Sequence, residues 1–333
     1  MSRRIAFVTG GAGFIGSNIV GRLARDWDLD VVVCDWLGAA DAGKWRNLAK
    51  HPVGDFILPE RTFEWLALNG PDVEVVIHMG AVSSTTETDA DKIVASNFIL
   101  SRDLWRWCAD HQRRLIYASS AATYGDGALG FDDDNALDAL AALRPLNAYG
   151  WSKAQFDIYA VRQAARGYAP PQWAGLKFFN VYGPNEEHKG PMKSVAAQMW
   201  PDVAHGRAVK LFKSYNADYA DGGQLRDFVY VRDVVNVIEW LIGRPDVSGV
   251  FNLGSGRARS FKHLAEAVFA AAGVQPHIDY IAMPMGLRER YQYFTEARLD
   301  RLRAAGYDGQ LTSLEDGVAD YVRNHLAQPD PYL

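Results

Sequence analysis

The chain carries Thr9-Gly10-Gly11-Ala12-Gly13-Phe14-Ile15-Gly16-Ser17 between an apolar run, residues 5–9, and an amphipathic stretch, residues 18–26. Glycines at this spacing allow a tight turn, and they let backbone N–H groups approach a phosphate at the positive end of the following helix. A plain turn would use the same glycines, so the place between a strand and a helix is what favours a dinucleotide-binding βαβ unit. The cofactor contacts predicted from this loop are Gly10, Gly13, Phe14, Ile15 and Gly16.

The same alternation continues through the N-terminal half of the chain. Short apolar runs rich in β-branched residues are separated by longer amphipathic segments, which is typical of parallel strands buried on both faces and joined by helices. The predicted strands are residues 5–9, 31–34, 73–78, 115–118 and 176–179, and the predicted helices are residues 18–26, 92–111 and 149–167. We therefore expect an α/β fold with a Rossmann-like doubly wound parallel sheet, whose ligands lie at the carboxyl ends of the strands.

The rhythm changes after about residue 180, where Pro and Gly interrupt the chain more often. Further short strands are predicted at residues 209–212, 226–230 and 250–253, with helices between them. These segments indicate a smaller C-terminal α/β domain. We expect residues 1–180, with part of 225–260, to form an NAD(P)-binding domain, and residues 181–333, without the returning segments, to form a substrate-binding domain.

Composition excludes several classes of protein. The 333 residues hold 35 Lys and Arg against 40 Asp and Glu, a net charge of −5, so there is no excess of positive charge for a nucleic-acid backbone. No apolar stretch reaches the roughly 18 residues of a membrane-spanning helix, and the run after Arg4 is too short for a signal peptide. Cys34 and Cys108 lie far apart without metal-ligand spacing, which favours a reducing compartment. We predict a cytoplasmic protein that acts on a small molecule and has no nucleic-acid or membrane partner.

An acidic run, Asp132-Asp133-Asp134, raises the question of a metal site. Partner ligands at a suitable spacing are not apparent, and a solvated loop uses the same residues. We predict an exposed acidic loop here and no metal ion in the protein.

The second predicted strand ends at Asp35, about 20 residues after the glycine loop, where a carboxylate accepts hydrogen bonds from the adenosine ribose. This acid strengthens the dinucleotide prediction and by itself favours NAD. Lys44 follows nine residues later and would neutralise a 2′-phosphate, although a single lysine is more often solvated. The choice between NADP and NAD is therefore left open by these two residues.

A catalytic set is predicted after the fourth strand. Ser120 follows the run 115–118, and Tyr149 and Lys153 lie four residues apart, on one face of a predicted helix. A phenol has a pKa of about 10 and becomes a useful base only where a cation, here Lys153, stabilises the phenolate. Ser120 would hold a substrate hydroxyl while Tyr149 removes its proton. The Tyr-x-x-x-Lys pair is common by chance, but together with the glycine loop and the strand-end serine it is specific.

With these three motifs in this order, the chain resembles the extended short-chain dehydrogenases/reductases that act on nucleotide sugars. The resemblance implies that Asn97 supports the active site and that residues 78–81 lie beside the nicotinamide ribose. A buried histidine or a polar helix face would also explain His78 and Asn97. The cofactor contacts that follow from the resemblance are Trp36, Met79, Gly80, Ala81, Ser83, Asn97 and Lys153, in addition to Asp35 and Lys44.

Later motifs narrow the resemblance to the ADP-L-glycero-D-manno-heptose 6-epimerase family, over nearly the whole chain. They are residues 83–87, 178–194, 225–231, 290–295 and 302–308, of which His188-Lys189-Gly190 and Arg290-Tyr291-Gln292 are the most specific. The family oxidises C6 of the heptose in ADP-D-glycero-D-manno-heptose to a ketone and returns the hydride to the other face. The resemblance therefore implies a tightly bound cofactor that is not consumed, NADP with NAD as the alternative, and a second acid/base group, Lys189.

The resemblance also implies the substrate contacts and the setting of the enzyme. Arg226 would pair with the diphosphate, for which a planar guanidinium is well suited. The predicted substrate-binding residues are Ser83, Asn180, Lys189, Phe212, Arg226 and Tyr291, with Arg290 beside the last of these. Lipopolysaccharide precursor synthesis in the cytoplasm and a homo-oligomer, with a pentamer as one form, are implied as well.

Some residues depart from the family pattern. Pro59 lies where a second lysine would face the 2′-phosphate, and Trp36 replaces an asparagine, which weakens the NADP prediction. Pro191 and Gln198 replace a serine and a histidine, and residues 214–224 form an extended loop of unassigned role.

Four alternative functions stay open. A nucleotide-sugar dehydratase places Asp-Glu after its Ser or Thr, whereas Ser120 is followed by Ala121-Ala122. Another nucleotide-sugar epimerase or a net dehydrogenase would share the first half of the reaction. A non-catalytic dinucleotide-sensing protein would not need both Tyr149 and Lys153.

Overall fold

The computed structural model describes residues 4–26, 29–85, 87–288 and 291–333. Within these residues the central sheet has seven strands in the order β10-β6-β5-β4-β1-β2-β3, and every neighbouring pair is parallel. The strands are β1 (Ile5–Thr9), β2 (Asp30–Cys34), β3 (Asp55–Ile57), β4 (Val73–His78), β5 (Arg114–Ser120), β6 (Trp173–Phe178) and β10 (Gly249–Leu253). The predicted Rossmann-like doubly wound sheet is confirmed.

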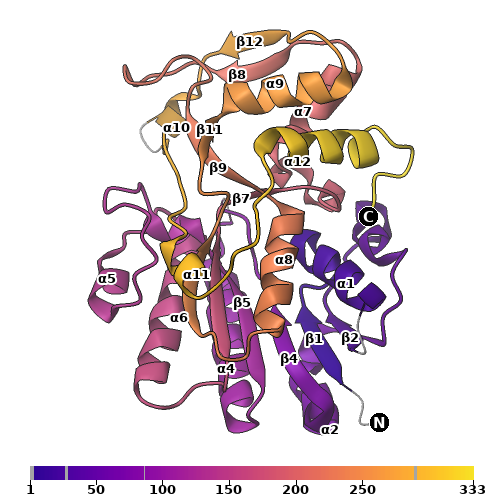
Figure 1. Ribbon diagram of the computed structural model, residues 1–333, viewed down its shortest axis with the longest axis vertical. Coiled ribbons are helices and arrows are strands. Elements are labelled where there is room, and N and C mark those ends of the chain that lie inside the picture. Colours follow the sequence, from indigo (N-terminus) through magenta and orange to yellow (C-terminus); the bar gives the residue numbers. More distant parts are fainter. Residues whose placement is uncertain (1–3, 27–28, 86, 289–290) are drawn as a thin grey trace.

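Helices cover both faces of this sheet (Figure 1). On one face α1 (Phe14–Asp26) and α8 (Val231–Ile242) pack, and on the other α2 (Thr62–Asn69), α4 (Leu100–Asp110) and α6 (Ala148–Ala165). Strand β2 is apolar from Val31 to Cys34 because both faces of the sheet are buried. Val31 and Val33 pack in the core on the side of α1 and α8, whereas Val32 and Cys34 pack in the core on the side of α2, α4 and α6.

Most of the chain after β6, apart from α8 and β10, builds a smaller unit, drawn above the large sheet in Figure 1. It contains the three-stranded sheet β11-β9-β7 and the pair β12-β8, with a core of its own. Its elements are β7 (Asn180–Tyr182), α7 (Val195–Ala204), β8 (Val209–Phe212), β9 (Leu225–Tyr230), β11 (Ala258–Ser260), α9 (Phe261–Ala272), β12 (Ile278–Ile281) and α12 (Leu314–Tyr321). The short helices α3 (Ala90–Ile93), α5 (Leu137–Ala142), α10 (Met285–Arg288) and α11 (Asp300–Ala304) complete the described helices.

Several elements differ from the sequence prediction. Helix α1 begins at Phe14, because the glycine loop leads into it without a linker. The predicted helix 92–111 is interrupted by a π-helical turn, Val94–Ile99. Strand β3 and helix α2 were not predicted at all.

The order of the strands reverses at β1, whose neighbours are β2 on one side and β4 on the other. Thr9 therefore lies level with Cys34 and with His78. A crevice forms outside the carboxyl ends of strands at such a point. None of the helices formed by the described residues has both the length and the apolar character to cross a bilayer.

Candidate active site

A cleft of about 1030 Å³ opens at this reversal point and is lined by residues of the large sheet and of the smaller unit. It brings together most of the predicted site residues: Gly10, Gly13, Phe14, Ile15, Gly16, Asp35, Trp36, Lys44, Met79, Gly80, Ala81, Ser83, Ser120, Tyr149, Lys153, Asn180 and Lys189. Asn97, Phe212, Arg226 and Tyr291 do not line it. The predicted Arg290, and Thr86 in the 83–87 motif, lie outside the described residues.

The glycine loop is packed so tightly against neighbouring backbone that Gly10 and Gly16 have no room for a Cβ. Gly10 has a φ of +64°, and a Cβ on it would lie 2.6 Å from the backbone nitrogen of Gly80. A Cβ on Gly16 would lie 2.1 Å from the carbonyl oxygen of Gly10. This geometry leads directly into the N-terminus of α1 and fits the diphosphate of a dinucleotide.

Asp35 directly follows β2 and lines the cleft, at the position where the sequence predicts a contact with the adenosine ribose. Its carboxylate accepts hydrogen bonds from the backbone N–H of Ala12 at 3.0 Å and from that of Trp36 at 2.8 Å. Lys44 donates to Asp35 Oδ1 at 2.7 Å and to the carbonyl oxygen of Trp36 at 2.7 Å. Lys44 is therefore paired, and its positive charge lies where a ribose 2′ substituent is expected.

His78 is a structural residue at the end of β4. Its Nδ1 lies 2.6 Å from Thr9 Oγ1, and its Nε2 lies 2.8 Å from Ser101 Oγ. Burial, with a smaller contribution from Lys153, lowers the pKa of His78 to about 3, so its ring is neutral. Thr9 Oγ1 also accepts from the backbone N–H of Gly80 at 3.1 Å, which fixes the turn after β4.

Asn97 lies in the π-helical turn and is wholly buried. Its amide bonds both backbone groups of Val82, accepting from the N–H at 2.8 Å and donating to the carbonyl at 3.0 Å. It also donates to Ser152 Oγ at 3.1 Å. Asn97 thus ties the loop after β4 to α6, which fits a supporting role and places no part of its side chain in the cleft.

Tyr149 meets Ser120 because α6 starts against the turn that follows β5. Asn147 caps the helix by accepting from the backbone N–H of Gly150 at 2.8 Å. A Cβ on Gly150 would lie 2.6 Å from the carbonyl oxygen of Ala122, so only glycine allows this approach. Ser120 ends β5 and caps the 3₁₀ turn Ala121–Tyr124.

The protonation properties of Tyr149 and Lys153 depend on burial. Burial raises the pKa of the Tyr149 phenol, a hydrogen bond with Ser120 lowers it, and the charge of Asp157 raises it. Burial lowers the pKa of Lys153 to about 8, against the opposite effect of Asp157. Lys153 Nζ donates to the carbonyl oxygen of Ala118 at 2.8 Å. A tyrosine and a lysine so placed can exchange a proton with a substrate hydroxyl.

Lys189 enters the cleft from the other side, on the 3₁₀ segment Glu187–Met192. Its Nζ lies 5.1 Å from the centroid of the Phe14 ring. Burial lowers the pKa of Lys189, and Glu186 opposes this effect. Since a lysine must lose its proton to act as a base, this burial favours an acid/base function.

Two neighbours of Lys189 carry roles that the sequence did not reveal. Glu186 is wholly buried and accepts from the N–H and the hydroxyl of Ser194 and, at 3.0 Å, from the hydroxyl of Tyr321. His188 lies 3.1 Å from the Asn47 amide, and burial lowers its pKa to about 4. The motif 178–194 contains Glu186 and His188, but it did not distinguish a loop anchor from a ligand.

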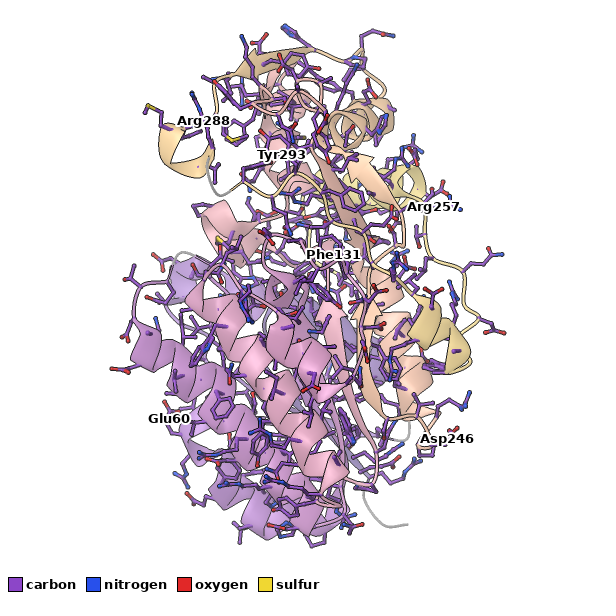
Figure 2. All side chains as sticks on the ribbon, turned by 90° about the vertical axis from the view of Figure 1, so that its left-hand side faces the viewer. Glu60, Phe131, Asp246, Arg257, Arg288 and Tyr293 are labelled. Carbon is purple, nitrogen blue, oxygen red and sulfur yellow. The ribbon has the colours of Figure 1, made fainter. Side chains whose placement is uncertain are left out.

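Arg226 lies behind the end of the cleft. The centre of its guanidinium is 5.6 Å from the Phe261 ring and 5.3 Å from the Tyr291 ring, and Phe261 lines the cleft whereas Arg226 does not. Among the described residues it has no carboxylate partner, and burial lowers its pKa. Phe212 also lies outside the cleft lining. Figure 2 shows Tyr293, close in sequence to Tyr291, in the smaller unit above Phe131.

The prediction of an exposed acidic loop at 132–134 is wrong for Asp133. This residue is 4% exposed, and its Oδ2 accepts from the backbone N–H of Asn252 at 2.8 Å. Asp133 therefore joins β10 to the loop that precedes α5. Over the ranges described above, no group of three or more His, Cys, Asp or Glu side chains is arranged to hold a metal ion.

Comparison with known proteins agrees with this geometry. The model of the NAD dependent epimerase/dehydratase family matches residues 6–254, which include the glycine loop, Ser120, Tyr149, Lys153 and Lys189. The chain belongs to the NAD dependent epimerase/dehydratase family.

Individual relatives are more specific. The chain is 49% identical to the ADP-L-glycero-D-manno-heptose-6-epimerase of Nitratidesulfovibrio vulgaris (strain DP4), over 98% of this chain and 99% of that protein. Its fold resembles the crystal structure of the ADP-L-glycero-D-manno-heptose-6-epimerase of Helicobacter pylori, with a TM-score of 0.79, 27% identity, and coverage of 97% of this chain and 96% of that one. It also resembles UDP-glucose 4-epimerase of Thermus thermophilus in complex with NAD, with a TM-score of 0.75, 27% identity, and coverage of 96% and 99%. The resemblance to heptose 6-epimerases is confirmed.

Proposed function

We propose that this protein converts ADP-D-glycero-D-manno-heptose to ADP-L-glycero-D-manno-heptose by inverting C6 through a 6-keto intermediate. The observation that carries the proposal is that two ionisable side chains, Tyr149 and Lys189, line one cleft from different parts of the fold. Tyr149 belongs to α6 beside the large sheet, and Lys189 belongs to the segment that follows β7. Inversion requires that the hydride return to the opposite face of C6, so the C6 oxygen must exchange its proton in two orientations, which two such groups can serve.

Gly10, Gly13 and Gly16 of the glycine loop would hold a nicotinamide dinucleotide, which would supply the hydride chemistry at C6. Tyr149 removes the proton of the C6 hydroxyl, and Lys153 stabilises the phenolate because its ammonium lies one helical turn away on the same face. Ser120 holds the hydroxyl oxygen by a hydrogen bond. Ser120 is the last residue of β5, after Ala118 and Ser119, so the strand fixes the position of the Ser120 hydroxyl.

Lys189 gives or takes the proton when the keto sugar presents its opposite face. Asn180, at the start of β7, and Ser83, in the loop after β4, are exposed and line the same cleft. The Arg226 guanidinium lies against the rings of Phe261, which lines the cleft, and of Tyr291, so both would meet the diphosphate beside Phe261. We therefore propose Asn180, Ser83 and Lys189 as sugar contacts and Arg226 and Tyr291 as contacts of the nucleotide end.

The test is direct. Purified protein is incubated with ADP-D-glycero-D-manno-heptose, and the configuration at C6 is followed by NMR. Tyr149→Phe should lower turnover by about 10²- to 10⁴-fold, the usual contribution of a general base. Lys189→Gln should lower it comparably while cofactor binding persists. Unchanged C6 configuration with active, cofactor-loaded protein would contradict the proposal, and release of reduced cofactor during turnover would support a net dehydrogenase.

The dehydratase alternative lacks its carboxylates, since Ser120 is followed by Ala121 and Ala122 in the turn beside Tyr149. A dinucleotide sensor has no use for a second buried lysine in the cleft. Another nucleotide-sugar epimerase is the remaining alternative. The UDP-glucose substrate distinguishes it in the same NMR assay.

For the cofactor we propose NADP, with Lys44 as the partner of the 2′-phosphate. The Lys44 ammonium donates to Asp35 Oδ1 and to the Trp36 carbonyl oxygen at the cleft wall. Its third N–H can donate to a phosphate at the same place. The indole N–H of Trp36 donates to Glu60 Oε1 at 2.8 Å, so this carboxylate has a partner of its own beside the cleft. Lys44→Gln should weaken NADP binding at least about tenfold, the value of one charge-assisted hydrogen bond, and leave NAD binding nearly unchanged. Equal losses for both cofactors would contradict the proposed role of Lys44, and tighter binding of NAD than of NADP by the wild-type protein would contradict the proposal of NADP.

We further propose a cytoplasmic homo-oligomer that serves lipopolysaccharide precursor synthesis. The exposed apolar side chains of Ile99, Leu146 and Trp151 lie on neighbouring elements around the start of α6 and support self-association. Sedimentation of the wild-type protein and of Trp151→Ser tests this, since a stable monomer in both would contradict it.

A further inference from the structure

A buried ion pair stands behind the catalytic set and has no role in the proposed mechanism. Lys177 Nζ, on β6, lies 2.8 Å from Asp157 Oδ2, on α6, and neither side chain is exposed to solvent. Burying two charges carries a large desolvation cost that their attraction returns only in part, so apolar residues of similar volume would often stabilise a core at least as well. A pair of this kind at this place therefore requires a reason other than stability.

Asp157 holds the carboxyl end of β5 from the side of α6. Its Oδ1 accepts from the hydroxyl of Tyr117 at 3.0 Å, and its Oδ2 accepts from Ser119 Oγ at 2.7 Å. One turn earlier on the same helix, Lys153 donates to the carbonyl oxygen of Ala118 at 2.8 Å. Consecutive residues of β5 are thus bound to the helix that carries the predicted base.

Lys177 holds the next residue of β5 from the other side. Its Nζ donates to Thr123 Oγ1 at 2.7 Å, and Thr123 Oγ1 in turn donates to the carbonyl oxygen of Ser120 at 2.9 Å. The ammonium also lies 4.9 Å from the centroid of the Tyr124 ring. The ion pair is therefore the hub through which the strand end, the turn 121–124 and α6 are joined.

The other titratable groups around this hub are neutral or paired elsewhere. His78, from β4, is neutral because burial lowers its pKa to about 3. Tyr117, from β5, and Tyr124, from the turn after it, stay protonated because burial raises the pKa of each well above 10. Asp133, from the loop before α5, has a pKa raised by burial and lowered by Lys177 among others, and it is bound to Asn252.

Asp157 acts on both members of the catalytic pair. Its negative charge raises the pKa of Tyr149 and that of Lys153. Lys177 carries the opposite charge at the same place and opposes this effect by Coulomb's law. Removing one member of the pair should therefore shift the titration of Tyr149 in one direction, and removing the other should shift it in the opposite direction.

We propose that Asp157 and Lys177 are positioning residues for the epimerisation: they hold the end of β5 against α6, and their opposite charges balance the field at Tyr149 and Lys153. This inference rests on the proposed function, because it assigns the pair a role in the reaction of Ser120, Tyr149 and Lys153. Neither residue lines the cleft, so neither is proposed to touch the substrate.

The experiment compares the cofactor-loaded wild-type protein with Asp157→Asn and Lys177→Met. Two quantities are measured against pH. One is the turnover number. The other is the tyrosinate absorbance of Tyr149, obtained as the difference between each protein and the same protein with the additional substitution Tyr149→Phe. Asp157→Asn should lower the apparent pKa of Tyr149 by about 0.5 to 1 pH unit, and Lys177→Met should raise it by a similar amount, as expected of one charge at short range in a protein. Turnover should fall at least about fivefold in both variants, since 1 kcal/mol of lost positioning corresponds to such a factor.

Ser119→Ala is the matched control. It removes one hydrogen bond to Asp157 and leaves both charges in place, so it should lower turnover without moving the titration of Tyr149. Lys177→Arg keeps the charge and should keep the wild-type titration. Asp157→Asn is nearly isosteric, so it serves the test even where Lys177→Met fails to fold.

Two results would overturn the inference. One is an unchanged Tyr149 titration in Asp157→Asn, which would leave only a structural role for the pair. The other is a shift of the same sign in Asp157→Asn and Lys177→Met. Failure of the proposed function is separate, since it appears as the absence of C6 epimerisation in the wild-type protein, whereas the absorbance titration needs no turnover.

Discussion

The ammonium of Lys189 stands over the ring of Phe14, with 5.1 Å between Nζ and the ring centroid. Phe14 is the first residue of α1 and belongs to the glycine loop, whereas Lys189 lies in the segment after β7. The loop that fits the cofactor therefore also holds the second acid/base candidate. A contact of this kind links cofactor binding to the position of Lys189.

Phe14→Leu should lower turnover by about 2- to 30-fold, the range that corresponds to a cation–π contact of about 0.5 to 2 kcal/mol. The ring stabilises the protonated lysine, so its loss should also lower the pKa of Lys189 further. The measurement is the pH dependence of the turnover number for C6 epimerisation. Phe14→Tyr keeps an aromatic face and is the control; equal losses in both variants would show that the ring does not act through Lys189.

Glu186→Gln should stabilise the protein near neutral pH. Burial raises the pKa of Glu186 above its usual value, although Ser194, Lys189 and Tyr321 oppose the shift. A carboxyl whose pKa is higher in the folded state favours folding at low pH, and this contribution is lost as pH rises from the unfolded pKa through the folded one. At pH 7 the wild-type protein therefore bears the cost of a buried charge that glutamine avoids.

Thermal unfolding between pH 4 and pH 8 measures this effect. Glu186→Gln should raise Tm by about 2 °C at pH 7, as expected of roughly 1 kcal/mol, and the difference should vanish near pH 4. The same variant removes a charge that raises the pKa of Lys189, so that pKa should fall. A lower Tm at every pH would show that the carboxylate is needed to hold Ser194 and Tyr321.

Asn97→Ala should destabilise the fold by about 1 to 2 kcal/mol, because it removes the partner of two part-buried backbone groups of Val82. Cofactor binding should weaken as well, since the loop after β4 loses its tie to Ser152. Chemical denaturation and cofactor titration measure the two effects. Asn324→Ala is the control: Asn324 is exposed and donates to Asp320, so a loss above about 0.5 kcal/mol is not expected there. Similar losses in both variants would contradict a special role for Asn97.

The large sheet could be predicted from the sequence because its strands are apolar on both faces. Strands β1 and β4 were predicted with the bounds that the structure has, residues 5–9 and 73–78. Strand β3 escaped prediction because it has three residues, Asp55–Ile57, at the sheet edge and carries no periodic pattern. Strand β10 was predicted, but its place beside β6 depends on long-range pairing that a local pattern does not contain.

The candidate site divides in the same way. Tyr149 and Lys153 share a helix, so their spacing alone placed them on one face. Arg226 and Tyr291 lie 65 positions apart, and nothing local indicates that their side chains meet outside the cleft. Lys177 lies in a run predicted as a buried strand, and a lysine in such a run is a signal that its charge has a buried partner.

Gly16→Ala should abolish cofactor binding, because a Cβ at this position would lie 2.1 Å from the carbonyl oxygen of Gly10. The contact atom is backbone, so relief requires opening the turn between β1 and α1, and the N–H groups that fit the diphosphate would turn away with it. We expect a loss of at least about a hundredfold in cofactor affinity, the value of two charge-assisted hydrogen bonds. Isothermal titration measures it. Gly286→Ala is the matched control, since a Cβ there meets no atom within 4 Å, and its affinity should equal that of the wild type. Wild-type affinity in Gly16→Ala would mean that the dinucleotide does not lie along this loop, and the assignment of the cleft would then lose its basis.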